Sequence, residues 1–367
     1  SKSHEPAIML SEKLMEMSPF DDGKVFFGSS GGDANDTQYK LFTYLNNALG
    51  KPHKKKFLGR KKGYHGITVA SGSMTGIPAN HKLFDLPISG FFHTDTPHYY
   101  REGIENETET EFLDRIAKNL EDLIIREGSD SFSAMIAEPL IGAGGVLIPP
   151  EGYFPKIQSI LEKYDIHLID DEVVCGFGRT GNCWGYETFS IKPSSMTIAK
   201  ALSSGYMPIS AVIVSEEIFE PIKHASDDVG VFAHGYTYSG HPVSCAVALK
   251  TLEIYERTQL FSHVSDVSAC FQNRVAKLSS YDHVGEARGI GLIAGIELVK
   301  DKETKENFEP YGKTGMLLAD ACQKNGLIVR AIGDVIAICP PLIITESQID
   351  ELFDILEASI EEVFKEN

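Results

Sequence analysis

Short apolar segments alternate with segments of helical periodicity, and this alternation constrains the fold more than any other feature. The helical segments span residues 33–49, 112–126, 153–164 and 241–257. The expected strands are Lys24–Phe27, Lys56–Gly59, Ser133–Ala137, His167–Asp170, Met196–Ala199 and Ser210–Val214. Strands that alternate with helices over this length predict an α/β fold with a mainly parallel sheet covered on both faces.

The pattern changes after about residue 262. Helical periodicity then covers residues 263–279, 312–325 and 345–364, and apolar segments typical of strands cover 290–298, 326–330 and 335–339. We interpret this part as a smaller α+β domain, because a chain of 367 residues is long enough for two domains. The expected division is a large domain over 1–262 and a small domain over 263–367.

The chain opens on an apolar stripe of Ala7, Leu10, Leu14 and Met17, whose 3-4-3 spacing predicts an amphipathic helix. No methionine starts the sequence, and we expect a further N-terminal segment upstream of Ser1.

Composition excludes several classes of protein. A formal net charge of −18 at pH 7 argues against a nucleic-acid or anionic-membrane partner. No apolar run approaches membrane-spanning length, and no signal-peptide pattern opens the chain. The six cysteines are scattered without a CxxC pair, which argues against a zinc site or a disulfide framework and favours a reducing cytoplasm. We therefore expect no metal.

Gly176, Gly178 and Gly181 form the pattern G-x-G-x-x-G after the strand that ends at Asp170. A dinucleotide-binding loop needs a helix after these glycines, whereas this chain continues with NCWGYETFSIKP, which is poor helix material. A flexible turn after a strand is the simpler interpretation. A nicotinamide oxidoreductase remains only a remote alternative.

Three acids, Asp170, Asp171 and Glu172, lie at the carboxyl end of that strand, where open α/β sheets place ligand chemistry. Lys200 follows a second short strand, SMTIA, beside small residues. An exposed acidic turn and a surface lysine are the simpler interpretations of each feature alone. Together they indicate pyridoxal phosphate (PLP), which needs a Schiff-base lysine, with its pKa lowered by desolvation in a pocket, and an anionic partner for the pyridine nitrogen.

A family resemblance rests on these residues and on motifs in matching order. LIDDEVVCGFGRTGN and TIAKALSSGYMPISAV resemble the class III (subgroup II) aminotransferases of PLP fold type I. Five further motifs agree: SSGGDANDTQYKL, YHGITVASGSMTG, AEPLIGAGGV, HGYTYSGHPV and RAIGDVIAICPPL. The resemblance covers essentially the whole chain and is closest to the ω-amine:pyruvate transaminases. Family chains normally carry an additional N-terminal segment.

The resemblance implies that Lys200 forms the internal aldimine and then moves the proton between the substrate carbon and C4′ of the cofactor. Asp171 is expected to keep the pyridine nitrogen protonated. Strand alternation points Asp170 and Glu172 to the other face, and it returns Val173 to the face of Asp171, where Val173 is expected to pack on the ring.

SSGGDAND resembles the phosphate-binding segment of the family, although the family pattern is S-G-S-E-A-N. Gly32 therefore lacks the usual hydroxyl, and the backbone amides of Gly31 and Gly32 at a helix N-terminus must hold the phosphate. A simple glycine-rich helix cap is the alternative. Thr237 matches the threonine that reaches the phosphate from the neighbouring subunit. A homodimer with shared active sites, or a tetramer, is therefore expected.

Four other residues receive roles from the resemblance. Tyr64 and His65, in the YHG motif, are expected at the cofactor, with the ring of Tyr64 stacked on it. Glu138 is expected beside the phenolic oxygen of the cofactor. Arg330 matches the mobile arginine that binds the carboxylate of the keto acid, a contact suited to a planar guanidinium. A buried tyrosine, a buried acid and a surface arginine are the corresponding simpler interpretations.

The expected activity is a ping-pong transfer of an amino group from an amine or ω-amino acid to pyruvate, giving alanine and an aldehyde or ketone. Another class III activity is the alternative: an α-ketoglutarate-dependent aminotransferase, a decarboxylase or an aminomutase. The unusual glycine at position 32 also leaves open a PLP-binding protein without catalysis.

Overall fold

The computed structural model describes residues 3–365, and within them a seven-stranded sheet forms the larger layer. Its order is β1 (Gly23–Gly28), β7 (Ser210–Ser215), β6 (Ser195–Ile198), β5 (His167–Asp171), β4 (Phe132–Ala137), β2 (Lys56–Arg60) and β3 (Phe91–Thr94). Strand β7 is antiparallel to both of its neighbours, whereas the other pairings are parallel. The predicted mainly parallel sheet is confirmed.

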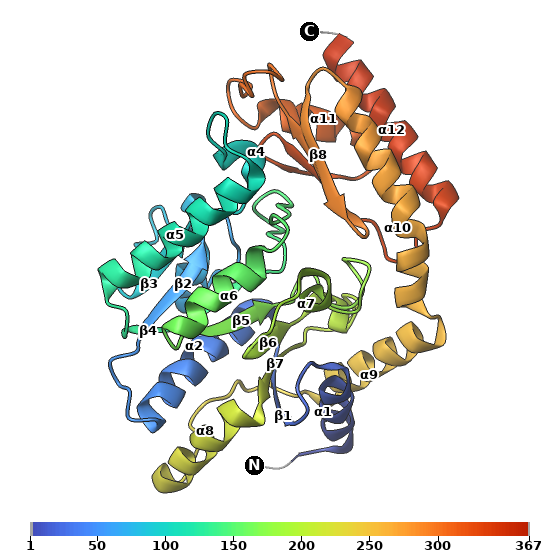
Figure 1. Ribbon diagram of the computed structural model, residues 1–367. Coiled ribbons are helices and arrows are strands. Elements are labelled where there is room, and N and C mark those ends of the chain that lie inside the picture. The colour runs from blue at the N-terminus through green and yellow to red at the C-terminus, as the bar shows by residue number, and fades with distance from the viewer. Residues whose placement is uncertain (1–2, 366–367) are drawn as a thin grey trace.

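Helices cover both faces of this sheet (Figure 1). On one face, α5 (Glu109–Glu127) and α6 (Tyr153–Lys163) bury Phe112 and Phe154 against β2, β4 and β5. On the other face, α2 (Gly31–Ala48) and α8 (Glu216–Val229) pack on the alternate side chains of the same strands. The predicted N-terminal helix is α1 (Glu5–Met17), which packs with α9 (Pro242–Arg257) through Leu10 and Leu14.

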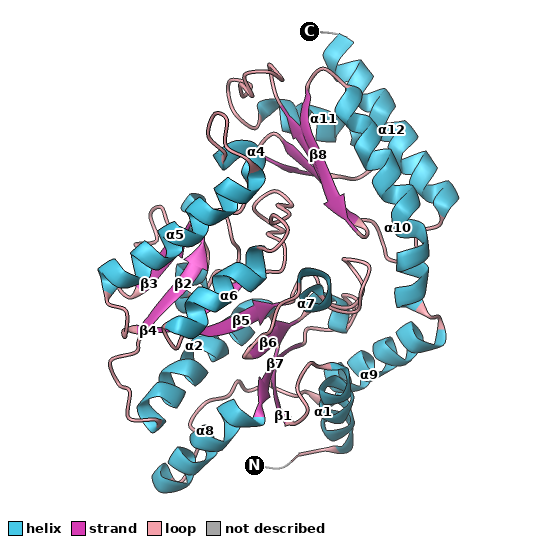
Figure 2. Cartoon of the chain, in the orientation of Figure 1, coloured by secondary structure: helices cyan, strands magenta, loops and turns pink. Residues whose placement is uncertain are grey.

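A second sheet of four antiparallel strands lies in the C-terminal part of the described chain, separate from the first (Figure 2). Its order is β10 (Arg330–Ile332), β11 (Val335–Ile338), β9 (Ile293–Leu298) and β8 (Val284–Ile290). One face packs on α10 (Leu260–Lys277), α11 (Lys313–Lys324) and α12 (Glu346–Lys365) around a core that begins at Val264. The division into domains at residue 262 stays a prediction.

Several predicted boundaries differ from the structure. The strand expected over 290–298 is a hairpin of β8 and β9 with its turn at Gly291, because the charged residues of β8 hide its strand pattern. The strand expected over 326–330 is wrong, since Gly326 has a φ of +94° and β10 begins only at Arg330. The sequence also left β3 and α8 unpredicted; α8 contains Pro221. The remaining short elements are α3 (Val69–Met74), α4 (Tyr99–Glu102), α7 (Gly185–Phe189) and the 3-10 turns η1 (Pro78–Asn80), η2 (Lys200–Leu202) and η3 (Leu278–Ser280).

None of the helices described in residues 3–365 combines the length and apolar character that crossing a membrane requires.

The core of the second sheet gives a stability prediction. Phe271 is fully buried and meets Phe353 edge-on, with 5.2 Å between ring centroids. We expect Phe271→Ala to lower the free energy of unfolding by about 3–5 kcal/mol, because it removes the ring and leaves a cavity. The exposed Ile328 provides the control, and Ile328→Ala should change stability by less than about 0.5 kcal/mol. Urea titration followed by circular dichroism measures both, and equal losses would contradict this description of the core.

Candidate active site

The ends of two neighbouring strands bring Asp171 and Lys200 to the same edge of the large sheet. Strands β5 and β6 are parallel, Asp171 pairs with Thr197, and Lys200 follows Thr197 by three residues in the direction of the strand. Asp171 is buried, whereas the Lys200 side chain is exposed and makes no hydrogen bond or ion pair within residues 3–365. The burial expected for Lys200 is therefore not provided by the described part of one chain.

The backbone of Lys200 is strained. Its φ is +42°, in the left-handed region of backbone conformation that residues other than glycine rarely adopt. Such a conformation persists only where the surrounding structure imposes it, and it is concentrated at functional sites. The exposed Lys305 also has a positive φ, of +59°, so the assignment of Lys200 rests on its place at the sheet edge beside the end of β5 and not on its backbone conformation.

The carboxylate of Asp171 is held by three donors. Its Oδ2 lies 2.7 Å from Nδ1 of His65 and accepts a 2.8 Å hydrogen bond from Nδ2 of Asn35. Its Oδ1 accepts a 3.2 Å bond from the amide of Val173. These donors come from three separate segments and fix the orientation of the carboxylate. Within the described chain, Nε2 of His65 is buried without a partner.

Asn35 is a residue that the sequence analysis missed. Its Nδ2 also donates to the backbone oxygen of His65, so it ties α2 to both the acid and the imidazole. The asparagine stands in the motif SSGGDAND, which offered a signal, but only the glycines of that motif were assigned a role.

The two acids beside Asp171 have different surroundings. Asp170 and Glu172 are buried and take no part in the hydrogen bonds of Asp171. Burial, with Glu172 close by, raises the pKa of Asp170 well above its usual range. Burial also raises the pKa of Glu172 to about 7, although the amide of Tyr186 donates to it. Both carboxylate oxygens of Asp171 thus accept hydrogen bonds, whereas at least one oxygen of Asp170 and of Glu172 has no partner within the described residues.

Glu138 links the end of β4 to the loop that carries Tyr64. Its Oε1 accepts from the amide of Tyr64 and its Oε2 from the amide of Gly142, both at 2.9 Å. Burial is the largest cause that raises the pKa of this carboxyl, and the charge of Asp171 adds to it. The ring of Tyr64 is half-buried.

The segment expected to bind phosphate forms the N-terminus of α2. Ser30 caps the helix, and the carboxylate of Asp33 accepts from the amides of Ser29 and Ser30 and from Oγ of Ser210. The amides of Gly31 and Gly32 have no acceptor within the helix, as for any first turn, and they can bind an anion. A Cβ at Gly31 would lie 3.0 Å from Val173, so the glycine allows a close approach there.

Thr237 and Arg330 are exposed and form no hydrogen bond or ion pair with the other predicted site residues in the part of the chain described. Thr237 lies between α8 and α9, in a segment anchored where the hydroxyl of Tyr236 donates to the backbone oxygen of Asp33 at 2.9 Å. Arg330 begins β10, on the other sheet. Within the described residues of one chain, Thr237 and Arg330 therefore form no hydrogen bond or ion pair with the other residues predicted at the site.

The glycine-rich segment packs against the second sheet. The amide of Leu292 donates to the backbone oxygen of Arg179 at 3.0 Å, and the guanidinium of Arg179 donates to the oxygens of Leu292 and Pro340. A Cβ at Gly178 would meet Phe261 at 3.2 Å. These contacts give the glycines a packing role, and no long helix follows them to bind a dinucleotide.

Comparisons with known proteins agree on one family. The model of the class III aminotransferases matches residues 2–360. The chain is 47% identical over 366 residues to gamma aminobutyrate transaminase 1, mitochondrial, of Solanum lycopersicum, which covers 100% of this chain and 71% of the relative. A solved transaminase with L-alanine is 48% identical, with a TM-score of 0.98 over 100% of this chain and 86% of the other. The ω-transaminase of Pseudomonas jessenii in complex with PMP is 47% identical, with a TM-score of 0.98 over 99% and 80%.

The fold and the strand-end site define a PLP-dependent enzyme of fold type I. The chain belongs to the class III (subgroup II) aminotransferases. Its cofactor is PLP, and its substrates are a small-molecule amine and a keto acid. The residues present fit the cofactor, since a lysine without a partner among the described residues, an oriented buried carboxylate and a glycine-lined helix N-terminus stand at one sheet edge. The oxidoreductase alternative is thereby set aside.

The environments of the adjacent acids give a second prediction. We expect Asp171→Asn to lower the rate of transamination by at least about a hundredfold, because a neutral amide stabilises a pyridinium poorly. Asp170→Asn is the matched control and should retain most of the rate, because Asp170 is buried with a raised pKa and an amide has the same shape. Single-turnover absorbance measurements compare the two variants, and equal losses would contradict the assignment.

The space around Gly32 gives a third prediction. A Cβ there would lie 3.6 Å from the nearest atoms, and the φ of Gly32 is not in the left-handed region, so a serine fits without strain. We expect Gly32→Ser to lower the dissociation constant of PLP by about ten- to a hundredfold through one added hydrogen bond to phosphate. Gly31→Ser is the control, because its side chain would press on Val173. Titration of PLP into the apo proteins measures both, and an unchanged constant for Gly32→Ser would mean that the phosphate lies elsewhere.

Proposed function

We propose that the protein transfers an amino group from an ω-amino acid or amine to pyruvate, in a ping-pong reaction that forms alanine and an aldehyde or ketone. The observation that carries the proposal is that Lys200, which has no hydrogen-bond or ion-pair partner within residues 3–365, stands at the same sheet edge as the oriented carboxylate of Asp171. The relative named as a gamma aminobutyrate transaminase supports an ω-amino acid as donor. The similar transaminase with L-alanine supports pyruvate and alanine as the other pair.

Lys200 and Asp171 carry the proton chemistry. When bound, PLP supplies an electron sink for the negative charge that develops on the substrate carbon. Lys200 would hold the cofactor through its amine and, once that amine is free, would remove a proton from the substrate carbon and return it. Asp171 would keep a proton on the pyridine nitrogen, and the donors Asn35 and His65 hold its carboxylate in one orientation.

The other residues hold and orient the cofactor. Gly31 and Gly32 offer backbone amides to the phosphate, and Thr237 of a second copy adds a hydroxyl, which makes the homodimer part of the proposal. Tyr64 and Val173 would hold the ring of the cofactor, and Glu138 would hold its phenolic oxygen. His65 acts through the carboxylate of Asp171.

Arg330 selects the acceptor. Its guanidinium is exposed and forms no ion pair within residues 3–365, and it can bind the carboxylate of pyruvate through two parallel hydrogen bonds. By turning outward, the side chain admits an amine that has no carboxylate.

The cytoplasmic location also stays a proposal, because the relatives are named mitochondrial or chloroplastic.

Activity assays test the proposal. We expect alanine to form from pyruvate with 4-aminobutyrate or 1-phenylethylamine as donor, at a higher kcat/KM than glutamate forms from 2-oxoglutarate. Lys200→Ala should abolish both alanine formation and the borohydride-reducible PLP adduct while circular dichroism stays unchanged. Lys192→Ala, at another exposed lysine, is the control. A preference for 2-oxoglutarate, or activity retained by Lys200→Ala, would overturn the proposed function or the assignment of the lysine.

A further inference from the structure

One row of residues crosses the second sheet from Arg330 to Arg288. Arg330 pairs with Ala337, Ala337 with Gly295, and Gly295 with Arg288. Residues that stand directly opposite one another in antiparallel strands point to the same face. The side chains of the two arginines therefore share a face, and three strand spacings, about 14 Å, separate their backbones.

This face meets the segment that follows β4. Ile293 and Ala337 on the face pack with Leu140 and Val146 in a small buried cluster, whereas the opposite face packs on α10, α11 and α12. Between the two arginines, the row contains only alanine and glycine. A Cβ at Gly295 would lie 2.8 Å from the backbone oxygen of Gly145, so the glycine allows the turn at Gly145 and Val146 to rest directly on the sheet.

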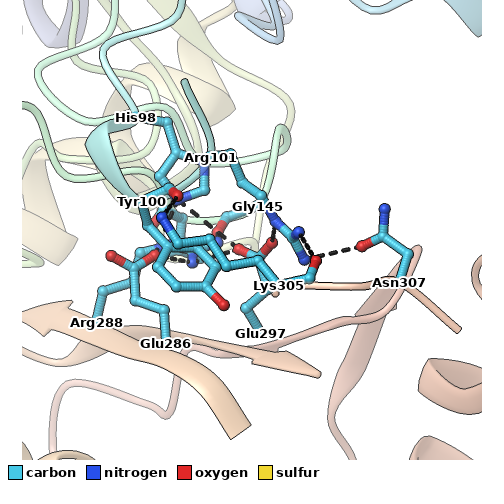
Figure 3. A network of polar contacts seen from close by, with 10 residues as sticks. His98, Tyr100, Arg101, Gly145, Glu286, Arg288, Glu297, Lys305 and Asn307 are labelled. Atoms are coloured by element: carbon cyan, nitrogen blue, oxygen red, sulfur yellow. Dashed lines mark hydrogen bonds and ion pairs between the residues drawn. The ribbon is translucent and has the colours of Figure 1, made fainter. Parts of the chain in front are cut away.

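The guanidinium of Arg288 forms hydrogen bonds to the backbone of this turn (Figure 3). Its Nε donates to the backbone oxygen of Val146 at 2.8 Å and its Nη2 to that of Gly145 at 2.6 Å. Its Nη1 donates to Oε2 of Glu286 at 2.5 Å and to Oε2 of Glu297 at 2.7 Å. The turn needs support, because Val146 is a β-branched residue with a φ of +53°.

The same turn leads back to the cofactor site. The amides of Gly145 and Val146 donate to the oxygen of Gly142 at 3.1 and 3.0 Å, and the amide of Gly142 donates to Oε2 of Glu138 at 2.9 Å. Hydrogen bonds therefore run without a break from Arg288 on the second sheet to Glu138 at the edge of the first.

Two further contacts brace the network. Arg101 forms an ion pair with Glu297, and Nε2 of His98 lies 2.8 Å from Oε2 of Glu286. His98, Glu286 and Glu297 are the kinds of residue that bind metals, but Nη1 of Arg288 already bonds to both carboxylates. A cation at this point would have to displace the guanidinium, so the cluster is a support for Arg288.

We propose that Arg288 is a positioning residue that fixes where Arg330 stands relative to the cofactor site. The inference rests on the proposed function, in which Arg330 binds the keto-acid carboxylate. Arg288 binds the turn at Gly145 and Val146, which leads to the first sheet, and it stands in the same row of the second sheet as Arg330. Its hydrogen bonds therefore fix the position of the second sheet relative to the first. The distance from the carboxylate-binding guanidinium to the reacting carbon follows from that position.

Two variants test this positioning role. Arg288→Lys keeps the charge, but a single ammonium cannot bond two carbonyls and two carboxylates. Gly295→Ala keeps the Arg288 side chain but places a Cβ 2.8 Å from the backbone oxygen of Gly145, which pushes the turn away from the sheet. Arg274→Lys is the matched control, because Arg274 bonds Asp350, Asp354 and Glu357 between α10 and α12 and does not touch the turn.

Hydrogen exchange of the apo proteins and steady-state kinetics of the holoenzymes are the readouts. We expect faster exchange over residues 140–147 in Arg288→Lys and Gly295→Ala, and no change in Arg274→Lys. We also expect the KM for pyruvate to rise about ten- to a hundredfold in the first two variants, as for a displacement of about 1 Å. The KM for 1-phenylethylamine, which has no carboxylate, should stay within a factor of about two of wild type, because Arg330 does not bind it.

Unchanged exchange, or equal effects on pyruvate and the amine, would overturn the proposal. Faster exchange without a selective rise in the KM for pyruvate would do the same, because Arg288 would then only stabilise the interface. If the wild-type enzyme uses 2-oxoglutarate in place of pyruvate, the proposed function fails. The same comparison with 2-oxoglutarate then decides the role of Arg288, since that acid also carries a carboxylate.

Discussion

The carboxylate of Asp171 is the point on which the arrangement of the site depends. It is buried at the end of β5, where an unpaired charge would be costly, and its donors come from α2 and from the loop that carries His65. The need to satisfy one buried carboxylate thus brings together segments that lie more than a hundred residues away in the sequence. The same contacts place the N-terminus of α2, with Gly31 and Gly32, beside the strand ends.

The alternation of side chains along β5 gives three consecutive acids different surroundings and therefore different roles. Asp171 meets donors on one face of the sheet, whereas Asp170 and Glu172 are buried on the other, where burial raises the pKa of both. A raised pKa favours the protonated form of an acid, so at a given pH these two residues carry less negative charge beside Asp171 than two acids with ordinary pKa values would. Alternation along a single strand is enough to separate the charged role from the structural one.

Local patterns predicted most of the large sheet and both strand-end residues, because buried parallel strands are continuous apolar runs and their carboxyl ends meet at one edge. Strand β8 was missed because Glu286 and Arg288 interrupt its apolar pattern, and those charges make sense only beside Glu297 and the turn at Gly145. Asn35 was missed for a related reason: its partners, Asp171 and His65, are distant in sequence. Propensity and spacing do not encode which distant side chain will satisfy a buried polar group.

The two sheets hold different parts of the predicted site, and this separation explains why their contact matters. The groups assigned to the cofactor stand at the edge of the large sheet, and Arg330, assigned to the substrate carboxylate, begins a strand of the small one. An arginine that must bind a carboxylate in one reaction step and leave it in another needs freedom of its side chain, but its backbone must stay in register with the cofactor. The antiparallel row from Arg330 to Arg288 meets both needs. Arg330 stays exposed at one end, while the buried Arg288 at the other end holds the row against the turn that leads to Glu138.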